Sequence, residues 1–319
     1  MRRQRNYKNK FFPFSPGIPW KVDRGKYIIP EIDFETWHKV LDGRDVIITA
    51  FGGLAESFLS LCAAEALVSF DSSHNICWLG HSKYSFFVRA QGLCKLSPIS
   101  LKPQTLKQYP VPLFLDNEGR AYFNILNNYL VRKSYWGQYP EDVKAPALEQ
   151  ITRNIMVPWN NYIPRLRNLG TDFVDGLRNT GRIRSSTKII SIIIENTRLD
   201  ILGWTLQNIK EFSQLASHKG WRVIIFTHKP NMFYGSNILA VEHSYSNILQ
   251  AIKKSWVVLS NDINWLLIAL MISDATLISR HINNQYNLFK NAESLDRCND
   301  IFTDRNISPI DVFGICEGL

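Results

Sequence analysis

Four short stretches of the sequence combine small, charged and hydrogen-bonding residues directly after runs that predict buried strands. The first covers residues 51–57, where Gly52 and Gly53 permit a tight turn and let a ligand approach the backbone. Glu56 falls in the first turn of the helix that follows, and a carboxylate there can act as a general base. The alternative is that Glu56 only complements the helix dipole.

The other three stretches could hold a phosphate. Arg198 follows the strand predicted at 189–194, and a second cation, Lys229, follows the strand predicted at 222–227. The last stretch begins the helix predicted at 264–272, where backbone N–H groups point at a bound anion. Simple turns, a solvated arginine and helix capping are the alternatives. The candidate phosphate-binding residues are Gly52, Gly53, Asn196, Thr197, Arg198, Lys229, Ser260, Asn261, Asp262 and Asn264.

Alternating strands and helices must position these residues. Such alternation is typical of a doubly wound parallel sheet, because each crossover must cover one face of the sheet. In such a sheet ligands bind beyond the carboxyl ends of the strands, which is where the four stretches fall. In the second half, strands are predicted at 189–194, 222–227, 238–242, 256–259 and 275–279, and helices at 205–217, 246–253 and 264–272.

The first half shows the same alternation less clearly. Strands at 46–51 and 76–79 precede helices at 55–70 and 84–93, which again predicts a parallel sheet. A third strand at 111–115 and a helix at 147–155 have weaker patterns. A polar, basic stretch over 165–188 then separates the halves and resembles a domain linker.

Composition excludes several classes of protein. Five cysteines without a C-x-x-C pair indicate neither a disulfide framework nor a zinc site, and they favour a reducing, cytoplasmic location. The uncharged apolar stretch 265–273 has about half the length that crosses a bilayer, so no transmembrane helix is expected. The sequence contains none of the G-x-x-x-x-G-K-S, G-x-G-x-x-G, G-x-S-x-G and H-E-x-x-H motifs.

The formal net charge of +9 favours anionic partners. No predicted helix carries the basic stripe interleaved with aromatic residues that nucleic acid requires, so a nucleic-acid partner is not expected.

The four stretches together resemble motifs of the GT-B glycosyltransferases, most closely those of the ADP-heptose:lipopolysaccharide heptosyltransferase family. Residues 51–56 (FGGLAE) are similar to that family's L-G-x-I-G-D loop, with Glu56 at the position of its catalytic aspartate. Residues 196–198 and Trp204 resemble its Thr-rich loop and the tryptophan before the next helix. Residues 260–262 (SND) match the start of its S-N-D-[ST]-G-x-x-H motif. A weaker likeness relates the glycine turn to the G-G-L-G-N-Q loop of fucosyltransferases.

The resemblance implies an α/β fold of two Rossmann-like doubly wound domains that face each other across a cleft. A basic, Pro- and aromatic-rich arm would occupy residues 1–44 and an acceptor domain residues 45–180. The nucleotide-sugar domain would cover residues 181–319, with its C-terminal segment packing back toward the first. The implied reaction moves a sugar from a nucleotide-activated donor to a glycan or other hydroxyl acceptor. Glu56 would be the base, and neither a cofactor nor a metal is expected.

Three departures from the family pattern favour a second hypothesis. The lysine of the Thr-rich loop is missing, and Asn264 and Leu267 stand where glycine and histidine would be. The chain would then be a catalytically inactive GT-B scaffold that acts as a binding or structural component of a larger, particle-like assembly. Under this hypothesis the arm would bind a protein partner, since its Pro, aromatic and basic residues can order on a neighbouring surface.

Overall fold

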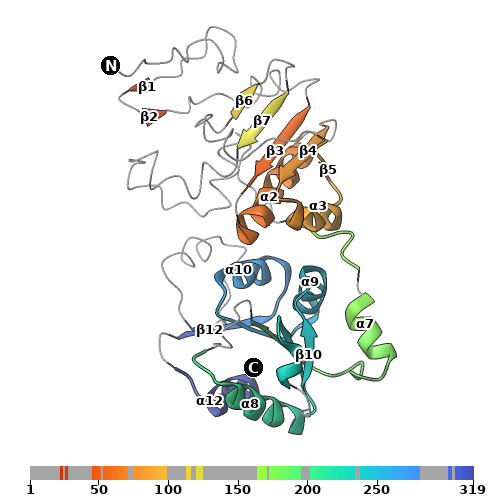
Figure 1. Cartoon of the computed structure of the whole chain (residues 1–319), viewed down its shortest axis with the longest axis vertical. Helices are drawn as coiled ribbons and strands as arrows, with labels where there is room; N and C mark the ends of the chain where they lie inside the picture. Colours follow the sequence, from red (N-terminus) through yellow and green to blue (C-terminus); the bar gives the residue numbers. More distant parts are fainter. Residues whose placement is uncertain are drawn as a thin grey trace. The chain divides into compact units, whose positions relative to one another are not determined.

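In the computed structural model, the chain folds into two compact units, residues 1–168 and 169–319 (Figure 1). Each unit is built on its own β-sheet with helices beside it, and a two-stranded antiparallel pair, β1 (Val22–Asp23) and β2 (Lys26–Tyr27), belongs to the first. The structure describes residues 22–23, 26–27, 45–51, 53–70, 75–98, 113–115, 120–124, 164–170, 172–194, 202–233, 238–280, 301–303 and 306–319.

The first unit contains a five-stranded sheet in the order β5-β4-β3-β7-β6. Its central strand is buried at every position, because parallel strands are covered on both faces. The indole Nε1 of Trp78 in β4 donates to Ser60 Oγ (2.9 Å), which ties α2 to the sheet. The elements are β3 (Val46–Ala50), α2 (Leu54–Phe70), β4 (Ile76–Gly80), a 3-10 turn (Ser82–Tyr84), α3 (Ser85–Gln91), β5 (Lys95–Leu96), β6 (Leu113–Leu115) and β7 (Ala121–Asn124).

One edge of this sheet differs from the parallel arrangement that the sequence predicts. β7 pairs with β3 in parallel, but β6, which lies within the strand predicted at 111–115, pairs with β7 antiparallel. Only residues 116–120 connect them, and a parallel crossover needs about a dozen residues or more. The short connection therefore forces the chain to reverse. The helix predicted at 147–155 lies outside the described residues.

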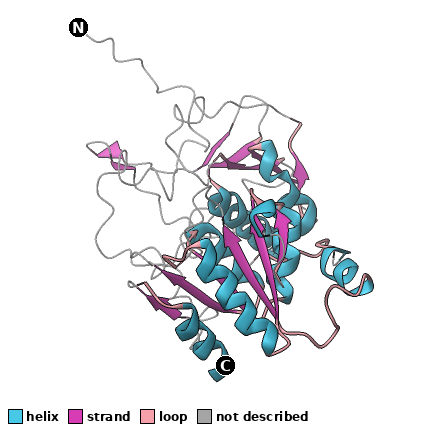
Figure 2. Cartoon of the chain, turned by 60° about the horizontal axis from the view of Figure 1, so that its bottom comes forward, coloured by secondary structure: helices cyan, strands magenta, loops and turns pink. Residues whose placement is uncertain are grey.

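The second unit contains a six-stranded sheet that is parallel throughout, in the order β10-β9-β8-β11-β12-β13. This is the strand order 3-2-1-4-5-6 of doubly wound dinucleotide-binding folds, and it confirms the architecture predicted for this half. Helices lie alongside its strands (Figure 2). The elements are β8 (Ile189–Ile194), α8 (Leu206–His218), β9 (Arg222–Thr227), a 3-10 turn (Pro230–Phe233), β10 (Leu239–Glu242), α9 (Tyr245–Lys254), β11 (Val257–Ser260), α10 (Ile263–Ile272), β12 (Thr276–Arg280) and β13 (Ile301–Thr303).

Two further helices of this unit occupy segments where the sequence predicts no helix. α7 (Asp172–Asn179) lies in the polar stretch 165–188, and the Phe173 amide donates to Gln250 Oε1 of α9 (2.8 Å). α12 (Pro309–Gly318) packs on α8, as Figure 1 shows. The sequence also predicts that the C-terminal segment packs back toward the first half, and this stays a prediction.

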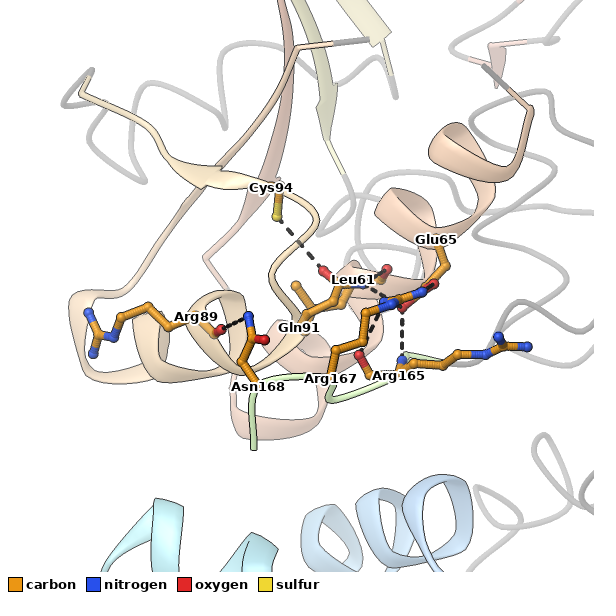
Figure 3. Close-up of polar contacts among 8 residues, drawn as sticks. All are labelled: Leu61, Glu65, Arg89, Gln91, Cys94, Arg165, Arg167 and Asn168. Atoms are coloured by element: carbon orange, nitrogen blue, oxygen red, sulfur yellow. Dashed lines mark hydrogen bonds and ion pairs between the residues drawn. The ribbon is translucent and has the colours of Figure 1, made fainter. Parts of the chain in front are cut away.

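A buried carboxylate fixes the last residues of the first unit to its helices (Figure 3). Glu65 of α2 is 6% exposed, and its two oxygens accept hydrogen bonds from the guanidinium of Arg167, each at 2.8 Å. The amide of Arg165 (2.8 Å) and Nε2 of Gln91 (3.0 Å) also donate to Oε1. Burial alone would raise the pKa of Glu65, but these hydrogen bonds outweigh it and lower the pKa. We call this network the Glu65 clamp.

Replacing Glu65 by alanine should reduce the free energy of unfolding by about 2–3 kcal/mol at pH 7, because buried donors lose their acceptor. The folded-state pKa is lowered, so this contribution is present above the ordinary carboxyl pKa of about 4.3 and is lost as the pH falls through the folded value. In urea unfolding, the difference in the free energy of unfolding between wild type and Glu65→Ala should therefore become smaller toward pH 3.

The exposed pair of Lys219 and Glu317 provides the control. Lys219→Ala should cost less than about 1 kcal/mol, since exposed ion pairs contribute little. A Glu65→Ala gap that stays constant between pH 7 and pH 3 would show that the ionised clamp is not what stabilises this region.

Candidate functional site

The turn at residues 260–264 lies where the strand order of the second sheet reverses. β8 and β11 are neighbours, with β9 and β10 on one side of the pair and β12 and β13 on the other. The connections from β8 to β10 therefore run toward one edge of the sheet and those from β11 to β13 toward the other, and doubly wound sheets bind ligands beyond the carboxyl ends of the strands at such a reversal. Ser260 is the last residue of β11, and α10 begins at Ile263. The predicted phosphate-binding turn thus occupies the position where doubly wound sheets bind ligands.

Hydrogen bonds within the turn define its shape. Ser260 Oγ donates to the carbonyl of Ile193 in β8 (3.1 Å) and accepts from the amide of Asp262 (3.1 Å). Asp262 caps α10, because its Oδ1 accepts from the amide and the side-chain Nδ2 of Asn264, both at 2.8 Å. Helix capping is therefore present, and any diphosphate would bind in addition to it.

Asn261 connects the turn to the loop that follows β8. Its Oδ1 accepts a hydrogen bond from the amide of Leu202 (3.2 Å). Leu202 (φ 55°) and Gly203 (φ 77°) both have left-handed backbone, which costs a leucine on the order of 1–3 kcal/mol. The buried side chains of Leu202 and Trp204 hold this conformation by packing into the core of the unit. The end of the β8–α8 loop is therefore fixed beside Asn261.

The remaining predicted residues are distributed over both units. Lys229 is exposed and follows β9 at the same carboxyl edge, with its amide donating to Thr227 Oγ1 (3.2 Å). Gly53 follows β3 in the first unit, and its carbonyl accepts from the amide of Ser57 in the first turn of α2 (3.0 Å). Glu56 belongs to the same turn of α2, but its side chain lies outside the described residues. So do four whole residues: Gly52, Asn196, Thr197 and Arg198.

An aromatic cluster beside Lys229 is not among the predicted site residues. His228 follows β9 and His243 follows β10, and their rings stack with centroids 4.6 Å apart. Tyr245 and Trp265 meet the edge of His243, with centroids 5.4 and 5.9 Å away. In the sequence, one histidine follows each of the two strands. That these two histidines are neighbours can be inferred only once β9 and β10 are known to pair. Flat rings at this edge can stack on another planar ring.

His81 is a second residue that the sequence did not single out. It follows β4 at the carboxyl edge of the first sheet, and its Nε2 donates to the carbonyl of Phe51 (3.1 Å). The ring also meets Phe51 edge-on, with centroids 5.5 Å apart. The first unit thus places a histidine ring next to the glycine turn.

The described cysteines, by contrast, do not offer a nucleophile. Cys62, Cys77, Cys94 and Cys316 are free thiols. Burial raises the pKa of Cys94 and of Cys316 to about 12, so neither ionises at neutral pH. Within the described ranges, no three His, Cys, Asp or Glu side chains gather as ligands for a metal ion. No helix there is both long enough and apolar enough to cross a membrane.

Comparison with solved structures shows that the fold is similar to that of glycosyltransferases of the GT-B type. ADP-heptose lipopolysaccharide heptosyltransferase II of E. coli superposes with a TM-score of 0.56 at 10% sequence identity, covering 86% of this chain and 98% of that chain. A family 9 glycosyl transferase of Veillonella parvula gives 0.56 at 10% identity, over 86% and 96%. E. coli heptosyltransferase WaaC, solved with ADP, gives 0.53 at 9% identity, over 86% and 97%.

No family model matches the sequence, and no curated protein matches it. At identities near 10% the structural likeness establishes the fold alone. It confirms the predicted α/β class and the predicted likeness to the heptosyltransferases, which rested on short motifs. That the two units face each other across a cleft stays a prediction.

The Asn261→Ala variant tests whether the turn at residues 260–264 holds the end of the β8–α8 loop. Without the side-chain acceptor, the Leu202 amide loses its hydrogen bond, so unfolding should become easier by about 1–2 kcal/mol. Hydrogen exchange at the Leu202 amide should accelerate as well. Asn261→Asp keeps an acceptor oxygen and should preserve most of the protection. Equal exchange rates in wild type and Asn261→Ala would mean that Asn261 does not hold this loop.

Proposed function

We propose that this chain transfers a sugar from a nucleotide-activated donor to an acceptor hydroxyl, and that the second unit binds the donor. The observation that carries the proposal is the turn at residues 260–264, which follows β11 at the strand-order reversal of a parallel sheet. That position takes the ligand in doubly wound folds. The fold shared with heptosyltransferases, one of them solved with ADP, supports the proposal.

The donor diphosphate needs positive potential, because it leaves with increasing negative charge in the transition state. The start of α10 supplies the positive end of a helix dipole, and Lys229 supplies a full charge at the same edge. Arg198, in the loop that ends beside Asn261, would add a second cation. The stacked rings of His228 and His243 lie next to Lys229 and suit the planar base of a nucleotide.

Glu56 is the proposed base in the first unit. It would take the proton of the acceptor hydroxyl while the acceptor oxygen bonds to the anomeric carbon of the donor sugar. The bond from that carbon to the diphosphate breaks at the same time, with inversion, and the electron pair leaves with the diphosphate. The support is the position of Glu56 in the first turn of α2, directly after the turn at the carboxyl end of β3.

A catalytically inactive scaffold is the second candidate, and one observation favours it. Leu267 stands where the heptosyltransferase pattern has histidine, and it is 3% exposed within the apolar helix α10. This helix therefore contributes a core residue where the family pattern contributes a polar one.

Glu56→Gln should reduce turnover by about 100-fold or more, because the amide cannot accept the acceptor proton. Donor affinity should change little, since the proposed donor site belongs to the other unit. Release of nucleoside diphosphate from each nucleotide sugar measures both quantities. Glu211→Gln, on α8, is the matched control and should leave turnover unchanged. Undiminished turnover in Glu56→Gln would remove Glu56 from the mechanism.

Thermal-shift titration with ADP, GDP, UDP, CDP and their sugars tests donor binding. A ligand at about 100 times its dissociation constant stabilises the folded state by about 2.7 kcal/mol. One nucleotide should raise the melting temperature, with an effect that weakens in salt and disappears in Arg198→Ala. Arg184→Ala, which removes an exposed arginine near the amino end of β8, should keep the shift. If no nucleotide shifts the melting temperature at millimolar concentration, the scaffold hypothesis takes precedence.

A further inference from the structure

His81 connects the end of β4 with the glycine turn that precedes α2. Ala50 and Gly80, which end β3 and β4, are paired in the sheet. Phe51 and His81 are the next residues beyond these two strand ends. Nε2 of His81 donates to the carbonyl of Phe51 (3.1 Å), and the two rings meet edge-on with centroids 5.5 Å apart. A hydrogen bond and a ring contact therefore join the start of the turn to β4.

Gly80 allows the two strand ends to lie this close together. A Cβ at position 80 would come within 2.5 Å of the carbonyl oxygen of Ala50 and would overlap the ring of Trp78. Trp78 is itself bound to Ser60 of α2 through its indole N–H. A side chain at position 80 would therefore push β4 away from both β3 and α2. Glycine at this position brings the residue that follows it, His81, within reach of the turn.

The glycine turn is anchored on both sides. On the helix side, the carbonyl of Gly53 accepts from the amide of Ser57 in the first turn of α2 (3.0 Å). On the strand side, the carbonyl of Phe51 accepts from His81. Only two residues separate Phe51 from the first residue of α2. Because glycines leave the backbone many accessible conformations, such a turn needs anchors to keep one of them.

We propose that His81 is a positioning residue for Glu56, which belongs to the first turn of α2. This inference rests on the proposed function, which assigns the base to Glu56. By holding the carbonyl of Phe51, His81 fixes the direction in which the chain leaves β3, and with it the position of the first turn of α2. A shift of about 1 Å in a reacting group can slow a reaction about 100-fold. His81 itself neither binds the substrate nor transfers a proton.

Steady-state kinetics of three His81 variants test this role. His81→Ala should lower kcat by about 10- to 100-fold and leave the KM for the donor nearly unchanged, since the proposed donor site belongs to the other unit. His81→Gln should regain most of the rate, because its amide nitrogen reaches nearly as far as Nε2 does. His81→Asn is one methylene shorter and should stay slow. If His81→Ala does not fold, the comparison of Gln with Asn still decides.

A double variant tests whether His81 acts through Glu56. If it does, the variant with both His81→Ala and Glu56→Gln should be no slower than Glu56→Gln alone, because the group that His81 positions is already lost. Rate losses that multiply would give His81 a role independent of Glu56 and overturn the proposal. His218→Ala, which removes an exposed histidine of α8, is the matched control and should turn over as the wild type does.

These measurements distinguish failure of this inference from failure of the proposed function. A wild type that transfers no sugar from any nucleotide donor, or a Glu56→Gln variant of undiminished rate, contradicts the proposed function and the role of His81 with it. If Glu56→Gln is slow but His81→Ala is as fast as the wild type, only the role of His81 is wrong. Hydrogen exchange at the Ser57 amide needs no reaction and should be faster in His81→Ala than in the wild type or His81→Gln. Equal exchange in all three would show that the turn does not depend on His81.

Discussion

The pairing of β8 with β9 on one side and β11 on the other determines where a ligand can bind in the second unit. β8 is buried along its whole length and is apolar except at Ser191, so both faces of the sheet must be covered by crossover helices. Covering both faces requires the strand order to reverse at β8, and doubly wound sheets bind ligands beyond the carboxyl ends of the strands at this reversal. The capped turn after β11 and the left-handed residue Leu202 lie at that edge of the sheet.

The strands that are buried on both faces were the elements that the sequence predicted most accurately. β8 and β9 were predicted at their observed bounds because strands covered on both faces appear as uninterrupted apolar runs. α7 was missed because Val174 and Leu177 are its only fully buried residues, and the polar remainder resembled a linker. The antiparallel pairing of β6 with β7 was not predicted, because it depends on the length of the connection between the strands and not on their composition.

Part of the candidate site was predictable because the strands that precede it were. Polar residues that directly follow a predicted strand, such as Ser260 and Asp262, can be assigned to the carboxyl edge of a sheet from sequence alone. The hydrogen bond from Leu202 to Asn261 could not be predicted, because the two residues are 59 positions apart and meet only through the strand order. The stack of His228 on His243 depends likewise on the pairing of β9 with β10.

The Glu65 clamp joins residues that are far apart in the chain, and this separation has a kinetic consequence. Glu65 and Arg167 are 102 positions apart, and closing a loop of that length costs about 4 kcal/mol of chain entropy by the logarithmic rule. Gln91 can meet Glu65 earlier, because only 26 positions separate them. We therefore expect α2 to pack with α3 first and the segment with Arg165 and Arg167 to join last. A contact that forms after the folding transition state affects the rate of unfolding more than the rate of folding. We therefore expect the Glu65 clamp to slow the unfolding of the first unit without speeding its folding.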